Sequence, residues 1–284
     1  MDPVTQVAVP LLTVYVMIVV GLELSFESFF KLLRPPQKLL SATLGQTLLL
    51  PLVAFAVIAL LDPPTHRTLG LIVIAGCPGG VFSNFFTSFS RGDTALSVVL
   101  TTACTLISIL TLPLVTTLGF VLFAGGSTAV RPPVGQMLGQ LVVLLLLPLL
   151  LGMTLKSRRP AFFAGIHPRL QRLGMVGIVL LVLWLVVDRL PTFPDELLSG
   201  WLTASLFLLP SMALGELVGR ALRLPPAERL TYVIELGFRN LGLAILVTVT
   251  LLGQDAFLAF AVVFFITTVV YALILTTIVR RRPA

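Results

Sequence analysis

The sequence predicts an all-α protein that crosses a membrane several times. Hydrophobic residues make up 57% of the 284 residues and charged residues only 11%, whereas an average soluble domain carries about 25% charged residues. The mean hydropathy is +1.07. The apolar residues gather in stretches of roughly 20, the length that spans a bilayer as a helix. Two of these stretches also contain polar residues that lipid should exclude.

Nine apolar segments are predicted to cross the bilayer. They cover residues 4–25, 39–61, 68–90, 94–118, 134–156, 171–190, 197–222, 227–251 and 254–279. The connections between them are short, so we expect one transmembrane unit over residues 1–284 without a soluble domain. The first segment is too long for a signal-peptide core and follows no basic leader, so we interpret it as the first helix of the mature protein.

The basic residues are distributed unequally between alternate loops. Fifteen fall in one set of loops or at the C-terminal end: Lys31, Arg34, Lys38, Arg91, Lys156, Arg158, Arg159, Arg169, Arg172, Arg220, Arg223, Arg229, Arg280, Arg281 and Arg282. Three fall on the other side: Arg67, Arg131 and Arg189. Positive charge gathers on the cytoplasmic side of inner-membrane proteins. The net charge of +7 therefore indicates an external N-terminus and a cytoplasmic C-terminus in the cell (inner) membrane, rather than a nucleic-acid partner.

The third segment contains a predicted helix break at Pro78-Gly79-Gly80. Proline donates no backbone hydrogen bond, and glycine adopts conformations that other residues avoid. Ser83 and Asn84 follow directly. Unwound backbone at membrane depth needs protein or a polar cavity around it, so this break indicates an internal site.

The eighth segment is interrupted by Glu235, Arg239 and Asn240, with Gly237 and Gly242 as weaker helix breakers. Charged groups persist at membrane depth mainly where they pair or line a polar cavity. The third and eighth segments are five apart, so the second is inverted relative to the first. Segments 1–4 then match segments 6–9, with segment 5 as a connector, and the two broken helices are expected to cross at mid-bilayer. Such paired interruptions are typical of transporter binding sites.

Polar oxygens from both halves are expected to converge at this crossing. Ser97 and Thr101 lie four residues apart and share one helix face. A hairpin turning near Gly92-Asp93 brings that face beside Ser83-Asn84, and Glu235 completes the cluster. Hard cations prefer all-oxygen shells, and a single carboxylate suits a monovalent ion. Sodium is therefore the expected occupant, with a proton on Glu235 as the alternative.

Other polar residues are given structural interpretations. Asp93 is expected to cap the fourth helix, since Gly92 precedes it and an apolar run follows. Glu23, near the end of the first segment, is expected to reach the membrane interface. His66 and His167 are predicted in loops, which places no histidine at membrane depth.

The motifs around the two breaks resemble those of the bile acid:sodium symporter family, and the similarity in layout covers nearly the whole chain. They read Cys77-Pro78-Gly79-Gly80, Ser83-Asn84, Arg91-Gly92-Asp93, Ala95-Leu96-Ser97 and Thr101, with Glu235-x-Gly237-x-x-Asn240-x-Gly242-Leu243-Ala244 in the second half. The chain is expected to be a prokaryotic, nine-helix version of that family.

The resemblance implies an inverted-repeat transporter built from a panel domain and a core domain. The panel is expected to hold the helices near 4–25, 134–156 and 171–190, and the core those within 39–118 and 197–279. The resemblance also implies a sodium site formed by Ser83, Asn84, Ser97, Thr101 and Glu235. A second sodium site in the family corresponds here to Gln46, Glu235 and nearby backbone carbonyls.

The chain departs from the family at Arg239, which stands where the second site has a glutamine. A guanidinium cannot ligate a cation. We hypothesise that its charge replaces the second sodium, either by balancing Glu235 or as a fixed countercharge for an anionic substrate. An ordinary structural pair between Arg239 and Glu235 is the alternative.

The function expected is sodium-coupled secondary transport of a small organic anion by alternating access, in a protein that acts as a monomer. The substrate site is expected beside Asn240, Arg239, Pro78, Gly79 and Gly80, where amides and a cation favour a carboxylate or sulfonate. Proton-coupled or exchange transport through Glu235, an arsenite-type permease and a passive channel or sensor are the alternatives. An enzyme is not expected, because no nucleophile–base pair or aspartyl dyad lies at membrane depth.

Overall fold

The computed structural model describes residues 3–23, 36–123, 133–188, 193–248, 252 and 256–281, and this part of the chain is helical. The helices are α1 (Pro3–Gly21), α3 (Pro36–Leu44), α4 (Leu50–Leu61), α5 (Thr65–Gly76), α6 (Val81–Phe89), α7 (Thr94–Phe123), α8 (Val134–Leu141), α9 (Leu147–Arg158), α10 (Pro160–Asp188), α11 (Phe193–Ala221), α12 (Pro226–Gly237), α13 (Leu241–Leu246) and α14 (Ala256–Arg281). The prediction of an all-α polytopic membrane protein is confirmed.

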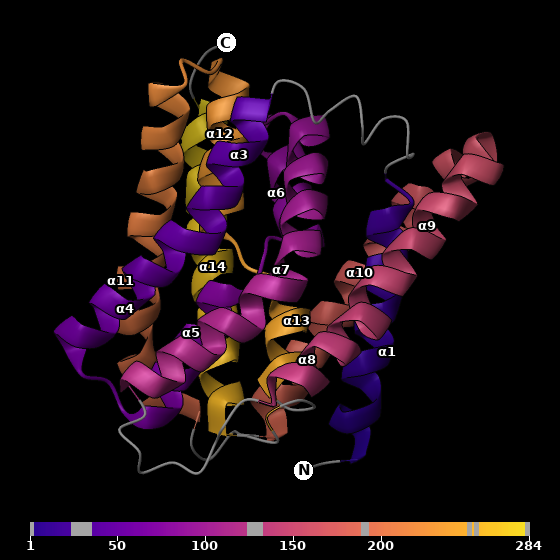
Figure 1. The fold of residues 1–284 in the computed structure, drawn as a ribbon. Helices are drawn as coiled ribbons and strands as arrows, with labels where there is room; N and C mark the ends of the chain where they lie inside the picture. Colours follow the sequence, from indigo (N-terminus) through magenta and orange to yellow (C-terminus); the bar gives the residue numbers. More distant parts are fainter. Residues whose placement is uncertain are drawn as a thin grey trace.

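The helices follow the predicted apolar segments in order (Figure 1). Six helical stretches of the described chain are long and apolar enough to cross a membrane, and α5 together with α6, bent by 69° at their break, passes the same test as a pair. The chief difference concerns α10, which begins at Pro160 rather than near residue 171. Proline is favourable at the first position of a helix. Polar residues in its first turns lower the local hydropathy, so the apolar pattern marked only the later part of this helix.

Two spans contain a five-residue π-helical stretch just before a proline. The stretch η1 (Gly45–Leu49) joins α3 to α4, and η2 (Val142–Leu146) joins α8 to α9. Pro51 and Pro148 follow these stretches. Proline lacks the amide hydrogen and crowds the carbonyl four residues earlier, so the helix widens locally. In the first case the widened turn carries Gln46 into the interior, where it is 3% exposed.

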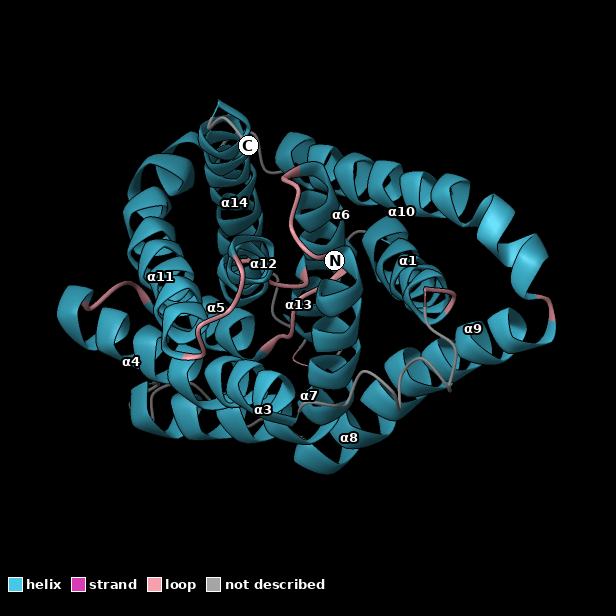
Figure 2. Cartoon of the chain, turned by 90° about the horizontal axis from the view of Figure 1, so that it is seen from above, coloured by secondary structure: helices cyan, strands magenta, loops and turns pink. Residues whose placement is uncertain are grey.

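The helices form two groups seen clearly from above (Figure 2). Helices α1, α9 and α10 pack against one another on one side. Helices α4, α5, α11 and α14 pack together on the other, where α12 packs along α11. Helices α6, α7 and α13 lie between the groups (Figure 2). The two broken helices, α5–α6 and α12–α13, therefore meet in the middle of the molecule.

The two ends of the chain lie at opposite ends of the molecule (Figure 1). The end that holds the C-terminus also holds the start of α3, the α6–α7 turn, the α9–α10 junction and the α11–α12 junction (Figure 1). The described basic residues at that end are Lys38, Arg91, Lys156, Arg158, Arg159, Arg169, Arg172, Arg220, Arg223, Arg229, Arg280 and Arg281. Arg67 lies at the opposite end, at the start of α5. Lys31, Arg34, Arg131, Arg189 and Arg282 fall outside the described residues.

Glycines allow α1 and α9 to cross at backbone contact. A Cβ atom at Gly152 would lie 2.2 Å from the Ile18 carbonyl oxygen and 2.9 Å from the Gly21 Cα. A Cβ atom at Gly21 would lie 2.2 Å from the Leu149 carbonyl oxygen. Small residues at helix crossings let membrane helices approach closely and gain packing energy.

We therefore predict that Gly152→Ala destabilises the protein by about 1–3 kcal/mol, because the new methyl group meets backbone that cannot yield. The matched control is Gly139→Ala, since a Cβ at Gly139 has no atom within 4 Å. Thermal unfolding in detergent should show a lower Tm for the Gly152 variant and no loss for the control. Equal Tm values for the two variants would contradict this account of the crossing.

Candidate functional site

The first break follows from the chemistry of Pro78. Helix α5 ends at Gly76, and Cys77 is extended, with φ −72° and ψ 145°. A residue before proline is driven out of the helical region by its steric clash with the ring. Gly80 is also extended, with φ −157° and ψ −171°, and α6 begins at Val81. The break expected in the third segment is confirmed.

The second break lies at Phe238–Asn240, between α12 and α13. Asn240 caps α13, because its Oδ1 accepts a hydrogen bond from the Leu243 amide at 3.0 Å. The backbone N–H of Asn240 in turn donates to the Pro78 carbonyl oxygen at 2.8 Å. The two breaks therefore contact each other directly, and each supplies a partner to backbone that the other leaves unbonded.

The turn between α6 and α7 folds the chain into the expected hairpin. Arg91 adopts a left-handed conformation with φ 64°, and Gly92 follows. Asp93 Oδ1 accepts a hydrogen bond from the Leu96 amide at 2.9 Å, so Asp93 caps α7 as predicted. The turn returns the polar face of α7 towards the start of α6.

Polar oxygens of α6, α7 and α12 converge at the crossing. Ser97 Oγ lies 2.6 Å from Glu235 Oε1 and 2.9 Å from Asn84 Oδ1. Thr101 Oγ1 lies 2.9 Å from Glu235 Oε2 and 3.1 Å from Asn84 Oδ1. Ser83 Oγ completes the group at 3.5 Å from Thr101 Oγ1. The structure thus brings together all five residues expected in the cation site, and we call them the oxygen cluster.

The hydroxyl groups of the oxygen cluster carry fewer hydrogens than the close oxygen–oxygen contacts that they make. The Ser97 and Thr101 hydroxyls each carry one hydrogen, yet each lies within 3.1 Å of both Asn84 Oδ1 and a Glu235 oxygen. When Glu235 is ionised, at least two of these four close contacts therefore join oxygens with no hydrogen between them. The Ser83 hydroxyl is used by the Gly80 carbonyl at 2.7 Å. Such electron-rich crowding around a carboxylate is favourable for a hard cation.

Glu235 is fully buried, and the Gly79 backbone approaches it closely. A Cβ at Gly79 would lie 2.6 Å from Glu235 Oε2, so only glycine permits this approach. A buried carboxylate is costly unless a cation or several hydrogen bonds compensate it. Two hydroxyl groups compensate it in part.

Arg239 lies on the other side of the crossing, in a cage of carbonyl oxygens. Its Nη1 donates to Cys77 O at 2.8 Å and to Gln46 Oε1 at 3.4 Å. Its Nη2 donates to the backbone oxygens of Glu235 and Leu236 at 2.8 and 3.0 Å. The guanidinium therefore bonds the backbone of Glu235 rather than its carboxylate, and these oxygens form the kind of shell that would suit a cation.

The other residues expected at the substrate site differ in which hydrogen-bonding groups they leave without a partner. The Gly79 amide donates to Gln46 Oε1 and the Gly80 amide to Ser83 Oγ, both at 3.2 Å. Pro78 uses its carbonyl for Asn240. Among the described residues, the buried Asn240 Nδ2 has no hydrogen-bond partner. Asn240 thus keeps a free donor, and Arg239 Nε and Gln46 Nε2 beside it are also buried without a partner in the described structure.

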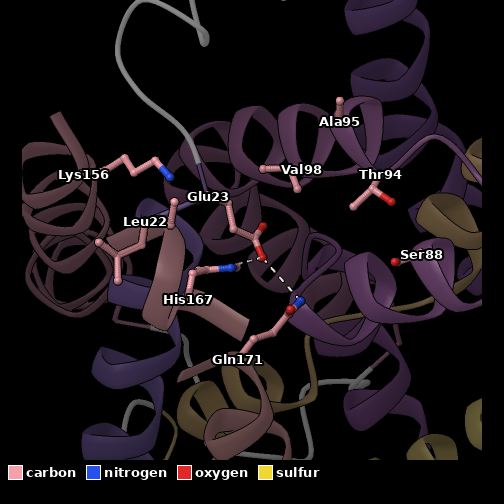
Figure 3. Close-up of a pocket in the computed structure, with 10 residues that line it drawn as sticks. Leu22, Glu23, Ser88, Thr94, Ala95, Val98, Lys156, His167 and Gln171 are labelled. Atoms are coloured by element: carbon pink, nitrogen blue, oxygen red, sulfur yellow. Dashed lines mark hydrogen bonds and ion pairs between the residues drawn. The ribbon is translucent and has the colours of Figure 1, made fainter. Parts of the chain in front are cut away.

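A cavity of about 500 Å³ lies between α1, α9 and α10 on one side and α6 and α7 on the other. Its lining residues, drawn in Figure 3, are Leu22, Glu23, Ser88, Thr94, Ala95, Val98, Lys156, Ala164, His167 and Gln171. The Lys156 amine and the His167 imidazole line this cavity, and the Glu23 carboxylate lies beside His167 (Figure 3).

Two expectations about this region were wrong. Glu23 does not reach the interface, because its side chain is only 6% exposed and bonds Asn84. His66 and His167 belong to α5 and α10 rather than to loops. His167 Nε2 lies 3.4 Å from Glu23 Oε1. A carboxylate at the end of an apolar segment is a signal that could have indicated a buried group, but its contact with His167 depends on the early start of α10.

Comparison with known proteins identifies relatives over most of the chain. The model of the Sodium Bile acid symporter family matches residues 10–192. An uncharacterized sodium-dependent transporter, YocS, from Bacillus subtilis is 32% identical over 232 residues, which are 80% of this chain and 69% of that protein. The hepatic sodium/bile acid cotransporter of Rattus norvegicus is 26% identical over 85% of this chain and 67% of its own length.

A probable chloroplastic sodium/metabolite cotransporter of Arabidopsis thaliana, BASS1, is 28% identical over 84% of this chain. The match spans 58% of that protein, somewhat more than half its length. These relatives are named as transporters or cotransporters rather than enzymes. Since the family model covers well over half of the 284 residues, the chain belongs to the Sodium Bile acid symporter family.

Proposed function

We propose that this protein is a secondary active transporter that couples the movement of a small organic anion across the membrane to sodium. The observation that carries the proposal is the oxygen cluster. In it the hydroxyls of Ser97 and Thr101 have too few hydrogens to donate to both the buried Glu235 carboxylate and the Asn84 oxygen. Sodium at this position would be bound by Ser83, Asn84, Ser97, Thr101 and Glu235. The names of the relatives, which specify sodium, support the same ion.

We propose alternating access between the two helix groups. The group of α1, α9 and α10 is assigned to the panel, together with α8. The helices from α3 to α7 and from α11 to α14 are assigned to the core. The cavity between them is lined by Thr94 at the start of α7 and by Lys156 near the end of α9, close to the basic end of the molecule, which we assign to the cytoplasm of a cell with this protein in its inner membrane. Rocking of one group against the other would expose the crossing to each side in turn.

The substrate is proposed to be a small organic anion held near Asn240, whose Nδ2 is buried without a partner in the described structure. Lys156 and His167 in the cavity supply groups that attract a carboxylate or sulfonate on its way there. Both Nη groups of Arg239 and the amides of Gly79 and Gly80 already donate to protein oxygens, which leaves Arg239 Nε and Asn240 Nδ2 as the donors without a partner among these described residues. We therefore assign Pro78, Gly79 and Gly80 to shaping the crossing, and Asn240 to contact with the anion.

Arg239 is proposed to take the place of a second sodium ion. Its donors face Cys77 O, Glu235 O, Leu236 O and Gln46 Oε1, oxygens that a neutral residue at this position would leave to a cation. A fixed guanidinium supplies the positive charge without leaving the site. This arrangement favours a single coupling ion. We further propose that the protein acts as a monomer.

The sodium site is tested by thermal unfolding of purified protein in sodium chloride against potassium chloride. We predict that sodium raises the Tm, since a ligand at ~100 times its Kd adds ~2.7 kcal/mol to stability. Glu235→Gln should abolish the sodium-specific increase. The control is Glu216→Gln, because Glu216 bonds Arg220 on the surface of α11 at 2.8 Å; it should keep the increase.

The same assay tests the transport proposal when organic anions are added. Sodium and the true substrate should each strengthen the other's stabilising effect, because their coupling is reciprocal. Counterflow of that anion in proteoliposomes should then require sodium. Sodium-independent uptake that is abolished by collapsing a proton gradient would instead favour the proton-coupled alternative through Glu235, whose carboxylate already accepts two hydroxyl contacts.

The role of Arg239 predicts a change in stoichiometry. We expect the wild-type protein to bind about one sodium ion and Arg239→Gln to bind about two, because the carbonyl cage is then left to a cation and glutamine adds an oxygen ligand. Equilibrium binding of radioactive sodium measures this directly. Arg229→Gln, a surface change beside Glu216, should leave the number unchanged. Two ions bound by the wild-type protein would contradict the proposal.

A further inference from the structure

Glu23 lies outside the oxygen cluster but contacts one of its members. It follows the last turn of α1, and its side chain is 6% exposed. Its Oε2 accepts a hydrogen bond from Asn84 Nδ2 at 2.9 Å. Its Oε1 faces the cavity, where Gln171 Nε2 lies at 3.5 Å and His167 Nε2 at 3.4 Å (Figure 3). The carboxylate thus lies between the cavity and the oxygen cluster.

Asn84 connects Glu23 to the oxygen cluster through the two ends of one amide group. Its Nδ2 donates to Glu23, while its Oδ1 faces the hydroxyls of Ser97 and Thr101 at 2.9 and 3.1 Å. The side chain is buried, with 1% exposure, so solvent does not decide which end points inward. The amide has one acceptor and one donor end, and only the oxygen end can ligate a cation.

Glu23 decides which end of the amide faces the oxygen cluster. If the amide were flipped, Asn84 Oδ1 would face the Glu23 carboxylate, and two acceptors would meet with no hydrogen between them. The NH₂ group would then face the cation position and repel the ion. A carboxylate opposite Nδ2 removes this second orientation, because ionised carboxylates only accept hydrogen bonds.

We propose that Glu23 is a positioning residue of the sodium site, which holds the Asn84 oxygen towards the ion without ligating it. The inference rests on the proposed function, since it concerns the same sodium ion. Residues that orient ligands from outside the first contacts typically affect ion affinity 10–100-fold. Glu23 directly follows α1, whereas Asn84 belongs to α6, so this bond also ties sodium affinity to the distance between the two helix groups.

The first test compares two substitutions by their effect on sodium affinity. Glu23→Ala removes the acceptor, and we expect the apparent sodium Kd to rise about 10-fold or more. Glu23→Gln keeps an oxygen that can accept from Asn84 Nδ2 but adds an NH₂ group that can donate to a flipped Asn84 Oδ1, so we expect its Kd to lie between those of the wild type and Glu23→Ala. The Kd is read from the rise of Tm with sodium at constant ionic strength, and the Tm in potassium reports any general loss of stability.

The second test removes the need for orientation. An aspartate at position 84 presents an oxygen in either orientation, so nothing remains for Glu23 to decide. It also places two carboxylates side by side, which repel. In the Asn84→Asp background we therefore expect Glu23→Ala to lower the sodium Kd, opposite in sign to its effect in the wild-type background. A residue that only supports the fold would weaken binding in both backgrounds.

The outcomes separate this inference from the proposed function. Sodium stabilisation of the wild type that Glu235→Gln abolishes, together with an unchanged Kd in Glu23→Ala, would overturn the role of Glu23 and leave the sodium site in place. A rise of the sodium Kd in Glu23→Ala in the Asn84→Asp background as well as in the wild-type background would show that Glu23 does not act through the orientation of Asn84, and would also overturn it. A wild-type protein that sodium does not stabilise would contradict the proposed function, and the inference with it.

Discussion

Two helices end in the middle of a protein that crosses the membrane, and the backbone groups released there must find partners within the protein. The two breaks meet this requirement largely through each other. The backbone N–H of Asn240 donates to the Pro78 carbonyl oxygen, and the Arg239 guanidinium donates to the Cys77 carbonyl oxygen across the crossing. The position of each break thus depends on the other. The polar groups that follow the breaks are carried to the same place, which is why the oxygen cluster lies beside the crossing.

The two sides of the crossing solve the problem of charge differently. On one side the Glu235 carboxylate faces hydroxyl and amide groups that hold too few hydrogens, so a mobile cation would complete it. On the other side the Arg239 guanidinium already bonds the carbonyl oxygens. A fixed positive charge and a site for a mobile one therefore lie back to back, separated by the backbone of α12. This asymmetry is the basis for proposing a single coupling ion.

Most of the fold and the oxygen cluster could be predicted because local chemistry determines them. The Pro78-Gly79-Gly80 run ends α5, the four-residue spacing of Ser97 and Thr101 places them on one face, and Asp93 caps the helix that follows it. The unpredicted features depend on packing between distant segments. The contacts of Glu23 with His167 and Gln171 depend on α10 beginning at Pro160. No local pattern predicts that Arg239 bonds backbone carbonyls rather than the Glu235 carboxylate. The π-helical turn at Gln46 had a local signal in Pro51.

The central claim is that a monovalent cation binds between the side chains of Ser83, Asn84, Ser97, Thr101 and Glu235. The most direct measurement is a crystal structure with sodium replaced by thallium, a monovalent ion with a strong anomalous signal. The account predicts one dominant anomalous peak among these five side chains and none in the carbonyl cage filled by Arg239. A peak in the cage, or no peak beside Glu235 at saturating thallium, would contradict it.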